Sequence, residues 1–145
     1  FNYRRILQGV PCGKDGITIT VNPGTGNVVM YSKTWTTPEN AVAAQTVPAI
    51  SRDAAIALVE REARACYPES ADSFRIVSAD LRWMDLYNQE KFIPAPGVIP
   101  LVWYVRFDDA TIRAWEFPVP EEGWVGAQNG TLLSMGYFHC RSNCG

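Results

Sequence analysis

Residues 21–29 read VNPGTGNVV, and residues 125–133 read VGAQNGTLL. When Val21 is aligned with Val125, Gly26 falls on Gly130, and two apolar residues follow at matching positions. Glycine adopts positive φ at little steric cost, so a glycine at this point is typical of a turn between two strands. Two hairpins of one design are therefore predicted. Either the chain holds two related sheet units in series, or the likeness reflects only the turn rules that all hairpins share.

Alternating side chains support a strand on the N-terminal side of the first turn. Ile17, Ile19 and Val21 point one way and the threonines between them point the other, as in a half-buried strand. The chain is expected to return as a second strand over residues 27–35. A further strand is expected over residues 3–7.

The C-terminal third is also predicted to be strand-rich. Residues 101–107 and 112–117 are expected as two strands joined by a turn at residues 108–111. The last hairpin, residues 123–138, is predicted to turn at Asn129-Gly130, since this dipeptide is the strongest signal for a two-residue hairpin loop.

One helix is predicted over residues 51–66. Ser51 is a suitable N-cap, and Asp53 in the first turn interacts favourably with the helix dipole. Pro68 stops the helix. One apolar stripe is expected to pack on the surrounding strands; it comprises Ile56, Val59, Ala63 and Cys66. Strands around one helix favour an α+β fold with antiparallel sheet segments packed against that helix.

Composition excludes several classes of function. The 145 residues are 47% hydrophobic and 19% charged, with a net charge of -2, which is typical of a globular chain. The sequence has no basic stripe for nucleic acid and no apolar run of the length that a membrane-spanning helix needs. The first residue is Phe1, which suggests a processed product or a fragment, and gives a hint of secretion.

The cysteine count points to an oxidising compartment. An even number of cysteines is consistent with one or two disulfides, and four cysteines allow three pairings. Free or buried thiols are the alternative. A closed zinc site is not expected, because the chain has a single histidine, His139, and no CxxC spacing. The four cysteines are Cys12, Cys66, Cys140 and Cys144.

No catalytic, cofactor-binding or metal-binding residue is predicted. The two histidines of an HExxH motif are missing, and neither a GxSxG motif nor a phosphate-binding glycine loop is present. His139 and Cys140 are adjacent, so on a strand their side chains would point to opposite faces. The acid pairs 108–109 and 121–122 are expected to be solvated, with calcium binding as a weaker alternative. The tryptophans are expected in the core, with a sugar-binding platform as the weaker alternative.

Several of these segments together resemble the PepSY family. The segments are VNPGTGNVVMY around Gly26, LVWYVRF followed by EFPVPEEGWVGAQNGTLLSMGYF around Gly130, and the helix opening at Ser51 with Ala55. The stretch FNYRRILQGVPCGKDGITITVNPGTG is similar to secreted proteins with paired PepSY-like units. The usual acidic residue of the motif is replaced by Asn22 in one copy and Gly126 in the other.

The resemblance implies two PepSY-like units: an incomplete one over residues 1–47, without a helix of its own, and a helix-plus-strand unit over residues 48–145. One continuous domain is the alternative. It also implies a non-catalytic module outside the cytoplasm that binds a peptidase or an envelope protein. The alternative is a subunit of an extracellular filament or surface assembly built by strand exchange at an open sheet edge. Gly26, Gly130 and Asn129 are then turn residues, and Tyr3, Arg5 and Leu7 mark the exchanged strand.

Overall fold

The computed structural model describes residues 1–35, 45–66, 68–84, 99–114, 116 and 118–136. The chain divides into two compact units: unit 1 holds residues 1–46 and 82–100, and unit 2 holds residues 47–81 and 101–145. The division after residue 46 lies close to the predicted boundary after residue 47. It differs from the prediction in that residues 82–100 group with the N-terminal strands.

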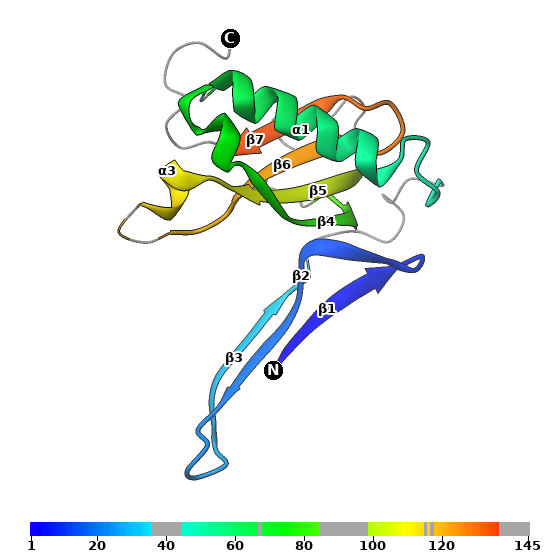
Figure 1. The fold of residues 1–145 in the computed structure, drawn as a ribbon. Helices are drawn as coiled ribbons and strands as arrows, with labels where there is room; N and C mark the ends of the chain where they lie inside the picture. Colours follow the sequence, from blue (N-terminus) through cyan, green and yellow to red (C-terminus); the bar gives the residue numbers. More distant parts are fainter. Residues whose placement is uncertain (36–44, 67, 85–98, 115, 117, 137–145) are drawn as a thin grey trace. The chain divides into compact units, whose positions relative to one another are not determined.

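Unit 1 is built around one long strand. β2 (Val10–Val21) lies between β1 (Asn2–Leu7) and β3 (Val28–Thr34) and runs antiparallel to both, as Figure 1 shows. Near its start, β2 also pairs in parallel with a further strand through Cys12 and Trp83. The alternation of apolar residues and threonines in the sequence therefore marks a real strand, which is longer than the sequence predicted.

Few side chains are buried among the residues of unit 1 that the structure describes. Trp83 is fully buried, and its indole Nε1 donates to the carbonyl oxygen of Leu7 at 3.0 Å. The backbone N–H of Met84 donates to the carbonyl oxygen of Pro100 at 3.0 Å. The buried hydrophobic residues of this unit are Val10, Cys12, Trp83, Met84 and Ile99.

Unit 2 is a sheet covered by a helix. Its strands follow the order β4, β5, β6, β7, with β5 antiparallel to β6 and β6 antiparallel to β7. In Figure 1, α1 lies across the face of β5, β6 and β7. The strands are β4 (Arg75–Trp83, whose last two residues belong to unit 1), β5 (Leu101–Asp108), β6 (Glu121–Gly126) and β7 (Leu132–Gly136). The helices are α1 (Arg52–Cys66), the 3-10 helix η2 (Pro68–Ser73) and α3 (Ala110–Arg113).

α1 occupies the predicted residues, and Val59 and Ala63 are buried as predicted, but Ala55 takes the central place expected for Ile56. The Ser51 hydroxyl accepts from the N–H of Ala54 at 3.1 Å, so it caps the helix. The fully buried positions are Ala55, Val59 and Ala63, whereas Ile56 lies at the edge of the core. Small residues bring the helix axis close to the sheet, so that alanine, rather than isoleucine, occupies the centre of the contact.

The predicted fold class is wrong. Strand residues far outnumber helical residues, the sheet is mixed rather than antiparallel, and three short helices are present in place of one main helix. Periodicity in a sequence identifies strands but does not reveal their pairing. The parallel contact at Cys12 and Trp83 joins residues far apart in the chain, and no local pattern marks it.

The chain after β5 also differs from the prediction. A turn at residues 108–111 and a strand from residue 112 were expected, but Ala110–Arg113 form a helical turn instead. The Asp109 carboxylate accepts from the backbone N–H of Ile112 at 2.9 Å, and Ile112 is buried. A side-chain cap and one buried anchor therefore prevail over the apolar alternation that favoured a strand.

Gly16 provides a test of how tightly unit 1 is packed. A Cβ at this position would lie 2.2 Å from the carbonyl oxygen of Tyr3, so β1 would have to move away from β2. We expect Gly16→Ala to lower the free energy of unfolding by about 2 kcal/mol, because a clash with backbone atoms cannot be relieved by a change of side-chain rotamer. Urea unfolding measures this, and hydrogen exchange should speed up first in the β1 amides.

Gly24→Ala is the matched control. A Cβ there meets only the Asn22 side chain, at 3.4 Å, and Gly24 does not lie at positive φ. We expect a change within about 0.5 kcal/mol. Equal losses in the two variants would contradict the close approach of β1 to Gly16.

Candidate functional site

The two hairpins share one strand register as well as one sequence pattern. The first strand of each hairpin also pairs with a third strand along its other edge. The result is the three-stranded segment β1-β2-β3 in unit 1 and β5-β6-β7 in unit 2. The pairing slips by one residue just before the first valine of each repeat. The matched pairs are Val21–Val28, Ile19–Tyr31 and Thr18–Ser32 in unit 1, and Val125–Leu132, Gly123–Met135 and Glu122–Gly136 in unit 2.

The two turns also have the same backbone hydrogen bonds. The N–H of Gly26 donates to the carbonyl oxygen of Asn22 at 2.9 Å, and the N–H of Gly130 donates to that of Gly126 at 2.9 Å. Gly26 has φ +74° and Gly130 has φ +70°. Asn129 is not at positive φ, so the predicted two-residue turn at Asn129-Gly130 is wrong. Each loop is longer and closes on a single left-handed glycine.

Side chains stabilise the two loops in related ways. The Thr25 hydroxyl accepts from the N–H of Asn27 at 3.3 Å, and the Asn129 amide oxygen accepts from the N–H of Thr131 at 3.0 Å. These donors and acceptors occupy equivalent positions in the alignment. The loops differ at their first residue, which is Asn22 in unit 1 and Gly126 in unit 2. A Cβ on Gly126 would lie 2.6 Å from Asn129 Oδ1, so this loop has no room for a side chain there.

The surroundings of the two three-stranded segments differ. In unit 2, one face of β5-β6-β7 is covered by α1, whose residues Ala55, Val59 and Ala63 pack against Val105, Phe107 and Val125. Gly123 lies beneath the helix, where an added Cβ would lie 2.6 Å from Val59. Two side chains near the start of α1, Ile50 and Leu58, lie against the turn glycine Gly130.

The equivalent face of unit 1 is exposed. Residues paired across antiparallel strands share a face, so β1, β2 and β3 present one apolar surface, which we call the open apolar face. The described residues of unit 1 include no helix. Phe1 is 74% exposed, Tyr3 59%, Val28 61% and Tyr31 60%. The open apolar face consists of Phe1, Tyr3, Ile17, Ile19, Val21, Val28 and Tyr31.

Cations lie at the end of the open apolar face away from the turn. Lys33 pairs with Ile17, and its ammonium lies 5.0 Å from the centroid of the Trp35 ring. The Arg5 guanidinium lies 4.4 Å from the same ring and forms an ion pair with Asp15 at 3.1 Å. The Arg5 and Asp15 side chains are 4% and 1% exposed, so this pair is buried.

The opposite face of this sheet carries a shallow polar groove of about 370 Å³. The Thr18 hydroxyl donates to the Asn2 side-chain oxygen at 2.9 Å within it. Its lining includes neither histidine nor cysteine, so it does not provide a nucleophile with its base. Residues along the groove include Asn2, Arg4, Gly16, Thr18, Ser32 and Thr34.

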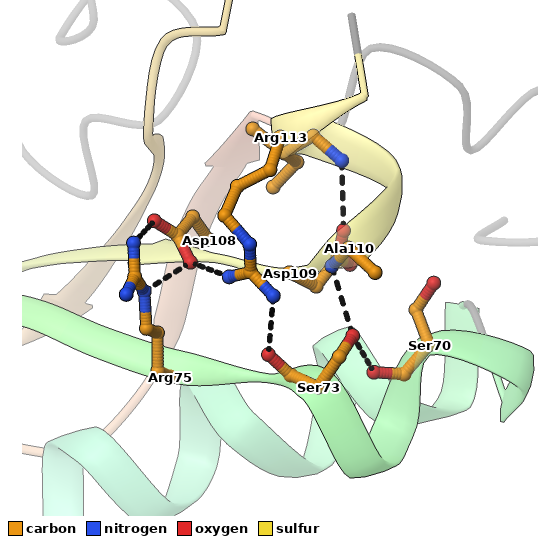
Figure 2. A network of polar contacts seen from close by, with 8 residues as sticks. Ser70, Ser73, Arg75, Asp108, Asp109, Ala110 and Arg113 are labelled. Carbon is orange, nitrogen blue, oxygen red and sulfur yellow. Dashed lines mark hydrogen bonds and ion pairs between the residues drawn. The ribbon is translucent and has the colours of Figure 1, made fainter.

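Unit 2 contains a compact polar network, drawn in Figure 2. Asp108 is 5% exposed and accepts from Arg75 through Nε at 2.7 Å and Nη2 at 2.9 Å, and it also forms an ion pair with Arg113. The Ser73 hydroxyl accepts from the N–H of Ala110 at 2.8 Å. The hydrogen bond from Arg75 chiefly lowers the pKa of Asp108. The network therefore ties η2 to α3 and has a structural role.

Three of the four acids in these pairs are buried rather than solvated as expected, and Glu122 is half-buried. Asp109 is 1% exposed and caps α3, and Glu121 is 6% exposed. Burial, with repulsion from Glu122, raises the pKa of Glu121 to about 7. Glu122 accepts from the Tyr104 hydroxyl and from Trp124 Nε1. Within the described part of the chain, no group of three or more His, Cys, Asp or Glu side chains could hold a metal ion.

The predicted cysteine and histidine residues lie apart or outside the described residues. Cys12 is buried in unit 1 with a free thiol, and burial chiefly raises its pKa. Cys66 ends α1 and is half-buried. His139, Cys140 and Cys144 lie outside the described residues. Cys12 therefore takes part in no disulfide here. Each pairing of all four cysteines would need Cys12, so only a single disulfide among Cys66, Cys140 and Cys144 stays a prediction.

The residues predicted to mark an exchanged strand are already engaged in unit 1. Tyr3 lies on the open apolar face opposite Ile17, Arg5 forms the buried ion pair, and the Leu7 carbonyl accepts from Trp83. Ile17 and Ile19 were seen in the sequence as half-buried strand residues. The alternation does not show that no described helix of unit 1 covers them, and this exposure makes the face a candidate site.

No protein family, curated protein or solved structure matches this chain. The resemblance to PepSY-like units therefore stays a prediction. None of the described helices is long and apolar enough to cross a membrane.

The raised pKa of Glu121 predicts a pH dependence. A folded-state pKa of about 7, against an ordinary value of 4.5, means that the folded chain holds this proton more tightly, so stability falls as pH rises from about 4.5 to about 7. We expect Glu121→Gln to abolish this fall and to raise the free energy of unfolding at pH 8 by about 2–3 kcal/mol. Urea unfolding across pH 4–8 measures it, with the exposed Glu69→Gln as control. A parallel pH profile in wild type and Glu121→Gln would contradict the assignment.

Asp108 predicts the opposite dependence. Its pKa is lowered, so the ionised carboxylate stabilises the fold above its ordinary pKa of 3.8, and the stabilisation is lost as pH falls below that value. We expect Asp108→Asn to cost about 1–3 kcal/mol at pH 7, with the difference shrinking towards pH 3. Asp72→Asn, at an exposed position of η2, serves as the control in the same unfolding measurements. A loss that does not change with pH would point to packing rather than charge.

Proposed function

We propose that this chain is a non-catalytic protein-binding module of the extracellular space or the cell envelope, and that regulation of a peptidase is one use of such a module. The observation that supports this most directly is β3. All seven of its residues are exposed, and among the described strands it pairs only with β2.

A strand of this kind combines two attractive features. Its outer edge offers backbone donors and acceptors to another chain, and its side chains add apolar contact area. Val28, Val29 and Tyr31 are each 60% exposed or more. Soluble proteins rarely leave so many apolar side chains together in water unless a partner covers them.

Self-assembly is the second candidate. The same open edge would let two copies pair through β3, and further pairing would build a filament or layer. Exchange of β1 is less favourable than pairing through β3, because β1 would have to give up its ladder with β2 and the buried Arg5–Asp15 ion pair.

Site-specific photo-crosslinking tests the proposal. A photoreactive phenylalanine analogue is placed at Tyr31 on the open apolar face, and at Arg61 on the exposed side of α1 as the control. In the organism that makes the protein, we expect one adduct of defined mass at position 31 and none at position 61. Excess purified wild-type chain should compete the adduct away, whereas a Tyr31→Asp chain should not.

The mass of the adduct separates the two candidates. A heteromeric mass supports the binding module, and twice the mass of the chain supports self-assembly. The same adducts at both positions, or none at position 31, would overturn both.

A further inference from the structure

We infer that the open apolar face is a docking site for an amphipathic α-helix of a partner protein, and that this helix carries a small residue where it crosses Ile19. This inference rests on the proposed binding function and specifies the partner.

The template for the missing layer is in unit 2. The hairpins β2-β3 and β6-β7 share register, bulge position and turn geometry, so the residues of β2 and β3 on this face have equivalents in β6 and β7. The third strands match in part: Tyr3 opposite Ile17 corresponds to Phe107 opposite Glu121, whereas Trp103 opposite Val125 has no counterpart opposite Val21 among the described pairs of β1. In unit 2 that face is covered by α1, whose buried contacts are alanine and valine, with Ile56 and Leu58 partly buried at the edge. The same surface geometry in unit 1 therefore fits a helix lying in the same direction.

One position on the sheet limits the size of the side chain that a docked helix can carry above it. Val59 of α1 approaches so closely that a Cβ on Gly123 would lie 2.6 Å from it. The equivalent of Gly123 in unit 1 is Ile19, which fills that space. A helix docking here at the same depth must therefore carry glycine or alanine where α1 carries Val59.

Charge complementarity indicates the helix direction and its C-terminal residues. The start of α1 lies against the turn glycine Gly130, so its C-terminal end points away from the turn. In unit 1 that far end carries the exposed Lys33, which pairs with Ile17. The negative end of a helix dipole and an acidic last turn would both be stabilised by this cation.

The same two features argue against α1 of a second copy as the occupant. Its Val59 would clash with Ile19, and its last turn carries Arg64, which would meet Lys33. α1 is also already packed in unit 2. A different polypeptide with an Ala/Gly-containing apolar stripe and an acidic C-terminal turn fits better.

A designed peptide tests this with the full-length chain. The probe is a stapled, fluorescein-labelled helix of the sequence of residues 51–66, with Val59→Gly and Arg64→Glu and with serine replacing Cys66. The control peptide keeps Val59 and Arg64. By fluorescence anisotropy we expect the designed peptide to bind at least about tenfold more tightly than the control.

Variants of the protein assign the binding to this face. Tyr31→Asp should abolish binding of the designed peptide, whereas Thr20→Asp, on the opposite face of β2, should leave it unchanged. Ile19→Gly should let a peptide that keeps Val59 but carries Arg64→Glu bind, because the variant recreates the space found at Gly123. Circular dichroism and a thermal melt establish that each variant is folded.

Equal binding of the two peptides, binding that survives Tyr31→Asp, or no binding of the designed peptide would overturn the inference. Failure here is distinguishable from failure of the proposed function. If the position-31 adduct forms but the designed peptide does not bind or compete, the partner is a strand or a second copy and the binding function stands. If the adduct is also missing, both fail.

Discussion

A sheet of three antiparallel strands cannot bury its own apolar face and needs another element packed against it. This constraint applies to both units of the chain. The β5-β6-β7 segment meets it with α1, which approaches closely because Gly123 leaves room for Val59. The β1-β2-β3 segment repeats the same register and turn but is not covered by a helix of its own among the described residues. The functional proposal follows from this difference, since Tyr31 and Val28 are exposed, whereas the equivalent Met135 and Leu132 of unit 2 are half-buried against the core.

Polar interactions fix the connections on which this layered arrangement depends. Asp108 holds Arg75 and Arg113, and Asp109 caps α3, so the chain leaves β5 as a helical turn. In unit 1 the buried Arg5–Asp15 ion pair lies where the pairing of β1 with β2 is irregular. Such pairs contribute more to defining one arrangement than to net stability, because each charge loses its hydration on burial.

Much of the local structure could be predicted from the sequence. The turn glycines, the alternation of Ile17, Ile19 and Val21, and the Ser51 cap all lie where local patterns indicated, because each depends on neighbours within a few residues. The predicted strand over residues 112–117 and the two-residue turn at Asn129 were wrong, since a side-chain cap and a longer loop prevailed over the local signal. The acid pairs were expected in solvent, and only tertiary contacts with arginine and apolar residues placed three of the four acids inside.

By itself the sequence determined which residues can be strand, turn or helix, and that two turns are alike, because backbone sterics and side-chain periodicity act over short distances. Only the tertiary structure decided that β2 also pairs in parallel at Cys12 and Trp83, that α1 covers one repeat, and that no helix among the described residues of unit 1 covers the other. Those choices depend on which distant surfaces meet and on the volume at single positions such as Gly123 and Ile19. Periodicity indicates neither which distant surfaces meet nor the volume at a single position. The same alternation of apolar and polar residues occurs whether a sheet face is covered by its own chain or by a partner.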